Sequence, residues 1–287
     1  MTTWAPALTK EYLAYLKRLA AGPLDRVRHS VSGGRRKSGS QGSSMEFSDF
    51  RPYVPGDDVR RLDKRSVARE GELYTKVFLE EKQALVEIYL DGSGSMAGEK
   101  GSAACLLAAS IAYVALERGD KAELVVFGEG LRAQRKRLNP GPGFWQAVSF
   151  LEETQFQGQT DLLKAVSQAM PVWREGLCYL ISDGFTQGET GQALAAIRGR
   201  GRRLFFLQVL SPQEEKPDFL GDFALTDVET DQKMDLSVDE ALVAAYQKAL
   251  KQFQSALEEE AKRSGGIFLC HRTTQDVRAT MQTLFVR

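Results

Sequence analysis

The sequence predicts an α/β fold built on a Rossmann-like, doubly wound and mostly parallel sheet that begins near residue 83. From there, apolar strand-like runs alternate with helical stretches, a pattern typical of a parallel sheet covered by helices. The runs 122–127 and 131–137 are separated only by Gly128-Glu129-Gly130, which predicts a hairpin. The hairpin adds one antiparallel strand at the edge of the sheet.

The individual elements follow from hydrophobic periodicity and from the turn residues between them. The expected strands are 84–90, 122–127, 131–137, 177–182, 203–210 and 266–270. The expected helices are about 101–118, 143–153, 161–170, 189–199, 239–263 and 274–285. Residues 222–236 are expected to form a short surface hairpin before the long helix.

Residues 1–82 are expected to form an N-terminal extension that packs on the α/β domain of residues 83–287. Residues 7–21 carry apolar side chains on one helical face, which predicts an amphipathic helix. Pro23 ends this helix.

Two segments of different composition complete the extension. Residues 30–45 are mostly Ser and Gly, with the basic triplet Arg35-Arg36-Lys37 in the middle, and this composition is typical of a flexible loop. Residues 46–82 mix acidic and basic side chains, which indicates ion pairing on a structured surface, with a docking surface as the alternative. Residues 73–79 alternate enough to predict a strand, at a sheet edge.

Composition restricts the classes of function. The chain has 287 residues, with 38 Lys and Arg against 38 Asp and Glu, so its formal net charge is zero and does not favour nucleic-acid binding. Three widely spaced Cys predict free thiols, and two His leave few candidates for a zinc site or a catalytic triad. No signal-peptide pattern and no apolar run of about 20 residues occur. We therefore expect a cytoplasmic protein without membrane insertion.

A polar loop follows the first expected strand of the α/β domain, with the sequence Asp91-Gly92-Ser93-Gly94-Ser95. In open α/β sheets, ligands bind at the carboxyl ends of strands, which is where this loop lies. Its carboxylate and its two hydroxyls are hard oxygen donors, of the kind that Mg²⁺ or Mn²⁺ prefers. The alternative is that the two Ser only cap the following helix.

Two further residues come later in the chain in a fixed order. Thr160 lies in a turn before a helix, and Asp183 ends the expected strand 177–182. The whole set resembles the metal-ion-dependent adhesion site of von Willebrand factor A domains. The resemblance implies that Ser93, Ser95 and Thr160 ligate the metal, and that Asp91 and Asp183 act mostly through water. For Thr160 and Asp161, helix N-capping is the alternative.

A second signature lies upstream, in the run from Glu46 to Asp63 (EFSDFRPYVPGDDVRRLD) and its continuation to Tyr74. This block is similar to that of the family called domain of unknown function 58, whose members carry it before an A-type domain. The resemblance covers about residues 33–287. Where the family usually has Trp after Asp63, this chain has Lys64.

The resemblance implies a non-enzymatic, Mg²⁺-dependent protein-interaction module. Family members often occur with MoxR-type AAA+ ATPases, which implies such an ATPase as a partner, or a client that offers an acidic residue to the metal. The alternative is a metal-dependent hydrolase such as a phosphoesterase. Ser93 stands where a dehalogenase-like phosphatase would need its second Asp, no phosphate-binding P-loop occurs, and no His base is evident. We therefore expect no enzyme.

Overall fold

The computed structural model divides the chain into two compact units. One unit combines residues 1–34 with 84–287, and the other spans 35–83. The division after residue 83 lies within one residue of the expected boundary, whereas residues 1–34, which carry the first helix, group with the α/β unit. The residues that the structure describes are 4–22, 45–62, 73–80, 84–170, 174–185, 190–217, 220–226 and 233–286.

The α/β unit is centred on a six-stranded sheet with the order β10-β7-β6-β3-β4-β5. All neighbouring strands are parallel except β4 and β5, which form the expected antiparallel hairpin at one edge. The strands are β3 Leu85–Asp91, β4 Lys121–Phe127, β5 Leu131–Leu138, β6 Gly176–Ser182, β7 Arg202–Leu210 and β10 Ile267–Arg272. The prediction of a doubly wound, mostly parallel sheet with one antiparallel edge strand is confirmed.

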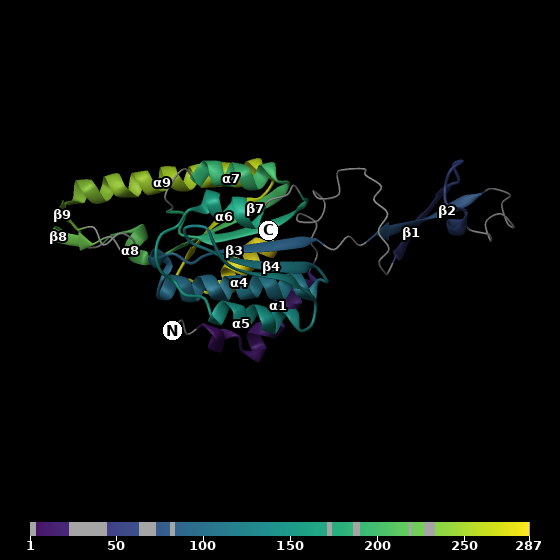
Figure 1. The fold of residues 1–287 in the computed structure, drawn as a ribbon, viewed down its shortest axis with the longest axis horizontal. Coiled ribbons are helices and arrows are strands. Elements are labelled where there is room, and N and C mark those ends of the chain that lie inside the picture. Colours follow the sequence, from purple (N-terminus) through teal and green to yellow (C-terminus); the bar gives the residue numbers. More distant parts are fainter. Residues whose placement is uncertain are drawn as a thin grey trace. The chain divides into compact units, whose positions relative to one another are not determined.

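Helices cover both faces of this sheet (Figure 1). On one face, α4 (Glu99–Glu117) contacts α1 (Lys10–Ala21), α5 (Gly143–Glu152) and α10 (Val277–Val286). On the other, α7 (Thr190–Gly199) contacts both α6 (Leu162–Ala169) and α9 (Glu240–Arg263). Two separate clusters of buried apolar side chains, one on each face, form the core.

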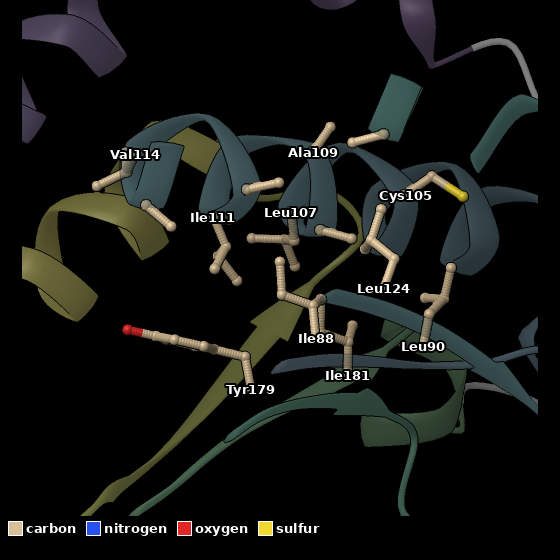
Figure 2. Close-up of a cluster of buried hydrophobic side chains, with 14 of the residues drawn as sticks. Ile88, Leu90, Cys105, Leu107, Ala109, Ile111, Val114, Leu124, Tyr179 and Ile181 are labelled. Carbon is tan, nitrogen blue, oxygen red and sulfur yellow. The ribbon is translucent and has the colours of Figure 1, made fainter. Parts of the chain in front are cut away.

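Side chains of β3 point alternately to the two faces of the sheet, so this strand contributes to both apolar clusters. Val86, Ile88 and Leu90 belong to the cluster beneath α4, whereas Tyr89 belongs to the opposite cluster. Both faces of the strand are buried, which explains why its sequence is apolar apart from Glu87 and the terminal Asp91. Figure 2 shows Ile88 and Leu90 pointing from the sheet toward α4.

Helix α4 is the central helix of the unit. Among the described helices, it alone has the length and apolar composition of a membrane span. However, 72% of its apolar window is buried inside the fold, as expected for the core helix of an α/β domain. Figure 2 shows Leu107 and Ile111 directed from α4 toward the sheet.

Helix α1 packs on α4 and belongs to the layer of helices on that face of the sheet. Thr9 caps it by accepting a hydrogen bond from the backbone N–H of Tyr12 at 3.2 Å. Its buried side chains are Tyr12, Leu16 and Leu19, and the hydroxyls of Tyr12 and Ser110 are 2.8 Å apart. The amphipathic N-terminal helix is therefore present, and its apolar face is part of the main core.

The two ends of the described chain also meet on this face. The hydroxyl of Tyr15 donates to the backbone carbonyl of Arg278 at 2.9 Å, across a separation of 263 residues. The guanidinium of Arg278 lies over the rings of Tyr12 and Tyr15. Helices α1 and α10 are thus joined by polar and cation–π contacts as well as by packing.

Smaller elements complete the α/β unit. A 3-10 turn, Gly94–Met96, lies between β3 and α4, and the short helix α8, Pro212–Glu215, follows β7. Strands β8 (Gly221–Thr226) and β9 (Lys233–Val238) pair antiparallel, which agrees with the hairpin expected at 222–236. Cys105, Cys178 and Cys270 are free thiols, as expected.

The second unit contains an antiparallel pair of strands, β1 (Met45–Pro52) and β2 (Tyr74–Glu80). The charged sequence of 46–82 predicts only the second of these strands. In β2, Thr75 is buried, although it lies in this charged segment. The basic triplet at 35–37 and Lys64 lie outside the described residues.

Candidate metal site

The predicted site residues lie at or just after the ends of two adjacent strands and in one further loop. Asp91 is the last residue of β3, and Asp183 directly follows β6, which pairs with β3 in parallel. Thr160 lies in the loop just before α6. Because parallel strands end at the same edge of a sheet, the fold brings Asp91 and Asp183 to one place.

Asp91 is the hub of the hydrogen bonds at this edge. One carboxylate oxygen accepts from the backbone N–H of Ser93 at 3.0 Å and from the hydroxyl of Thr160 at 2.8 Å. The other oxygen accepts from the hydroxyl of Ser182 at 2.6 Å. Both carboxylate oxygens of this completely buried side chain are therefore satisfied.

Ser93 and Ser95 lie next to Asp91, with their hydroxyl oxygens 3.0 Å apart. Ser93 precedes the 3-10 turn without making a side-chain cap, and Gly98 occupies the N-cap position of α4. The alternative role of these two Ser as caps of α4 is wrong, because the turn separates them from the helix.

The N-cap alternative holds for Asp161 and not for Thr160. The side chain of Asp161 accepts from the backbone N–H of Lys164 at 2.9 Å at the start of α6. Thr160 instead donates its hydroxyl proton to Asp91. The structure therefore brings Thr160 together with Asp91 and the Asp91–Ser95 loop.

Backbone hydrogen bonds tie the two loops of the site together. The N–H of Gly94 donates to the carbonyl of Gly158 at 2.8 Å, and the N–H of Gln157 donates to the carbonyl of Gly92 at 2.9 Å. These reciprocal bonds hold the Ser93–Ser95 turn against the loop that carries Thr160. The spacing of the three hydroxyls is thus fixed by main-chain contacts.

Arg132, on the edge strand β5, is a positioning residue that the sequence does not reveal. Its guanidinium donates to the carbonyl of Gly92 at 2.5 Å and to that of Gln157 at 2.6 Å. A Cβ atom at Gly128 would come within 2.1 Å of this guanidinium. Glycine at that position therefore leaves room for a side chain that holds both loops.

Asp183 faces a buried cation that the motif does not include. Lys100, in the first turn of α4, donates to one carboxylate oxygen of Asp183 at 3.0 Å and also contacts Glu214 of α8. The other oxygen of Asp183 accepts from the backbone N–H of Phe185 at 3.0 Å. Lys100 is only 6% exposed, and Asp183 is completely buried.

The charges at the site influence one another strongly. Burial raises the pKa of Asp91, and the nearby Asp183 carboxylate raises it further, against hydrogen bonds that lower it. For Lys100, burial lowers the pKa, but the carboxylates of Asp183 and Glu214 more than offset this, so the pKa is raised. The site is therefore a cluster of carboxylates in which the buried Lys100 provides one positive charge.

Exposed apolar side chains lie close in sequence to the buried polar groups. Phe185, two residues after Asp183, is 42% exposed and stacks on Phe253 of α9. Leu163, three residues after Thr160, is 38% exposed. The segments that carry the polar groups thus also present apolar surface to solvent.

Comparison with known proteins places the chain among uncharacterized relatives. The uncharacterized protein Rv1480 of Mycobacterium tuberculosis (strain ATCC 25618 / H37Rv) is 26% identical over 247 residues, which cover 82% of this chain and 77% of the relative. The uncharacterized protein Mb1516 of Mycobacterium bovis (strain ATCC BAA-935 / AF2122/97) matches to the same extent.

Two solved structures show a weaker likeness. The conserved hypothetical protein BatB from Bacteroides thetaiotaomicron is 18% identical, with 71% of this chain and 97% of that chain covered at a TM-score of 0.44. Proximal thread matrix protein 1 from the mussel byssus, with zinc occupied MIDAS motif, is 10% identical, with 71% and 47% covered at a TM-score of 0.44. At these levels, neither structure bears on what this chain binds.

One family pattern matches most of the chain, and it extends over parts of both compact units. The match spans residues 49–256, so it begins in β1 and ends in α9. The chain belongs to the family described as protein of unknown function DUF58.

Proposed function

We propose that this chain is a divalent-metal-dependent protein-binding module, with Mg²⁺ or Mn²⁺ as the metal. Ser93, Ser95 and Thr160 would ligate the ion directly, and Asp91 and Asp183 would act mainly through water. One observation carries the proposal: the Asp91–Ser95 loop, Thr160 and the end of β6 come together at one sheet edge, linked through Asp91.

The donor set fits a hard divalent cation. It consists only of oxygen atoms, from hydroxyls and carboxylates, which are ligands suited to Mg²⁺ and Mn²⁺. Within the described part of the chain, no group of three or more His, Cys, Asp or Glu side chains is arranged to hold a metal. The proposed site therefore depends on the hydroxyls as ligands.

Neutral hydroxyl ligands would leave the bound ion with much of its positive charge. When bound, the ion supplies a Lewis-acidic centre that attracts a carboxylate from another protein. The exposed ring of Phe185, close to Asp183 in sequence, offers apolar contact area to the same partner. The proposed ligand is thus an acidic side chain presented on a protein surface.

We extend the proposal to the class of partner. A MoxR-type AAA+ ATPase, or a client that such an ATPase remodels, is the proposed partner, with binding in the cytoplasm. This extension rests on the family resemblance of the Glu46–Asp63 block, whereas the metal site rests on the geometry around Asp91. The metal site and the partner therefore need separate tests.

Hydrolysis is less well supported by the side chains around the site. The hydroxyls of Ser93 and Ser95 contact each other, and neither has a histidine partner among its hydrogen bonds in the described residues. His271 is completely buried, with its Nδ1 2.8 Å from the hydroxyl of Thr280. We therefore keep the non-enzymatic function as the conclusion.

The metal test is a titration of the purified chain with Mn²⁺, followed by calorimetry and by electron paramagnetic resonance. The parent is expected to bind one ion. Ser95→Ala is expected to bind it at least about tenfold more weakly, because a direct oxygen ligand is lost. Ser167→Ala is the matched control, since that hydroxyl only bonds its own helix in α6. Equal binding by all three chains would refute the site.

The partner test is affinity capture from native lysate with three samples: the parent in Mg²⁺, the parent in chelator, and Ser95→Ala in Mg²⁺. An AAA+ ATPase that is retained only by the first sample supports the metal as the contact. Equal retention in all three would place the docking surface away from the metal.

A further inference from the structure

We propose that Lys100 is an internal counter-cation of this site, and that it weakens divalent-metal binding to an extent set by Glu214. The inference rests on the proposed metal site and concerns its regulation by residues outside the motif. Neither Lys100 nor Glu214 is part of the metal-binding pattern in the sequence.

The position of Lys100 places its charge where it opposes a bound cation. Its ammonium is 3.0 Å from a carboxylate oxygen of Asp183, one of the two acidic groups proposed to act on the metal. The side chain is almost fully buried, so water screens its charge only weakly. A divalent ion held beside Asp183 would therefore be repelled by the ammonium.

The ammonium also competes for a hydrogen-bond acceptor. Both oxygens of Asp183 already have partners, one in Lys100 and the other in the N–H of Phe185. A metal-bound water that donates to Asp183 would have to share an oxygen with Lys100. Any shift of the ammonium away from Asp183 would relieve both the repulsion and the competition.

Glu214 supplies the alternative partner for Lys100, and it is held in place independently. Its second carboxylate oxygen accepts from the backbone N–H and the hydroxyl of Ser211, at 2.8 and 3.0 Å, in a capping box at the start of α8. Its backbone carbonyl accepts from the hydroxyl of Tyr246 in α9. The carboxylate that draws Lys100 away from Asp183 is therefore fixed by α8 and α9.

Two substitutions should change metal affinity in opposite directions. Lys100→Met keeps the aliphatic stem and removes the charge, so Mn²⁺ is expected to bind about tenfold more tightly. Glu214→Gln keeps a residue suited to the capping box but removes the competing carboxylate. Lys100 then pairs with Asp183 alone, and Mn²⁺ is expected to bind severalfold more weakly.

The experiment compares Mn²⁺ dissociation constants, by calorimetry and electron paramagnetic resonance, for full-length parent, Lys100→Met, Glu214→Gln and the double variant. Lys121→Met is the matched control, because this exposed lysine begins β4 at the opposite end of the sheet. In the double variant, the weakening caused by Glu214→Gln should largely disappear, because Glu214 acts through Lys100. A purely structural role for Lys100 would weaken binding and would not produce tighter binding.

The outcomes separate this inference from the proposed function. If the parent binds Mn²⁺ and Lys100→Met binds it equally or more weakly, the role of Lys100 is refuted and the metal site stands. If none of the chains binds Mn²⁺, both are refuted. Should Lys100→Met fail to fold by circular dichroism, Glu214→Gln decides, and unchanged or tighter binding by that variant refutes the inference.

Discussion

Ser182 connects the sheet to the site through one hydroxyl group. As the last residue of β6, it donates to Asp91 at 2.6 Å and accepts from the N–H of Gly184 at 2.9 Å. Gly184 has φ of 85°, a backbone conformation that glycine adopts without strain. This single side chain thus fixes the Asp91 carboxylate and the turn that carries Asp183.

The buried His271 makes the stability of the folded chain depend on pH. Burial lowers its pKa to about 4, against a smaller opposing effect of Asp276. Between pH 6.5 and about 4, the unfolded chain takes up a proton on this imidazole and the folded chain does not. The stabilising contribution of neutral His271 is therefore complete above that range and decreases as the pH falls through it.

Urea unfolding of the parent and of His271→Gln tests this effect. On lowering the pH from about 7 to about 5, the parent is expected to lose about 2 kcal/mol more of its free energy of unfolding than the variant. The variant serves as the control for all other titrating groups, because it keeps them. Equal losses in both chains would show that His271 is protonated in the folded state.

Some residues of the site can be assigned to it from the sequence, and others cannot. Asp91, Ser93 and Ser95 follow a predicted strand, so their common position could be inferred directly. Lys100, Glu214 and Arg132 could not be inferred, because their contacts join positions 83, 114 and 40 residues apart. Such contacts depend on how helices and edge strands are arranged in space, and no local pattern records that.

At the scale of elements, the approach of β10 to β7 depends on a glycine. A Cβ atom at Gly266 would lie 1.5 Å from the backbone carbonyl oxygen of Leu204, a distance that requires the backbone to move. Gly191, near the start of α7, is exposed, and a Cβ atom there would meet no other atom within 4 Å. The same substitution should thus have opposite effects at the two positions.

Thermal unfolding measures the difference between these two variants. Gly266→Ala is expected to cost about 3 kcal/mol, since β10 must separate from β7 to accommodate the methyl group. Gly191→Ala is expected to stabilise the chain by up to about 1 kcal/mol through helix propensity. A Gly266→Ala variant as stable as the parent would show that β10 is not held closely against β7.

Strands with mostly apolar sequences are the most predictable elements. The observed β3, β4, β6 and β7 begin and end within one residue of their predicted limits, because burial on both faces makes most of their residues apolar. Strand β1 is not predicted, since charged residues interrupt its sequence and its partner β2 comes more than 20 residues later. The short α8 is not predicted either, because four residues carry almost no periodicity.

At the scale of the whole molecule, the apolar core belongs to one unit. Every buried residue of the two described core clusters lies within 4–22 or 84–286. The unit of residues 35–83 supplies none of them, although the family pattern covers most of that unit. The folding of the α/β unit can therefore be separated by experiment from the role of residues 35–83, called here the hairpin unit.

Two deletions test this separation by chemical unfolding. Removal of residues 45–80 is expected to change the free energy of unfolding by about 1 kcal/mol or less, because none of the side chains in the two described core clusters is lost. Removal of residues 1–22 is expected to cost several kcal/mol, since Leu16 and its buried neighbours leave an uncovered face on α4. A large loss in the first variant would show that the hairpin unit supports the core.

The joining of α1 to α10 has a consequence for how a ribosome produces this protein. The helix that carries Tyr15 is made early, yet its contact at Arg278 is made 263 residues later. At typical rates of translation, that interval lasts roughly 10–50 s. The apolar face of α1 can pack on α4 well before then, because Ser110 follows Tyr12 by only 98 residues, so the contact with α10 is the last step in completing this face.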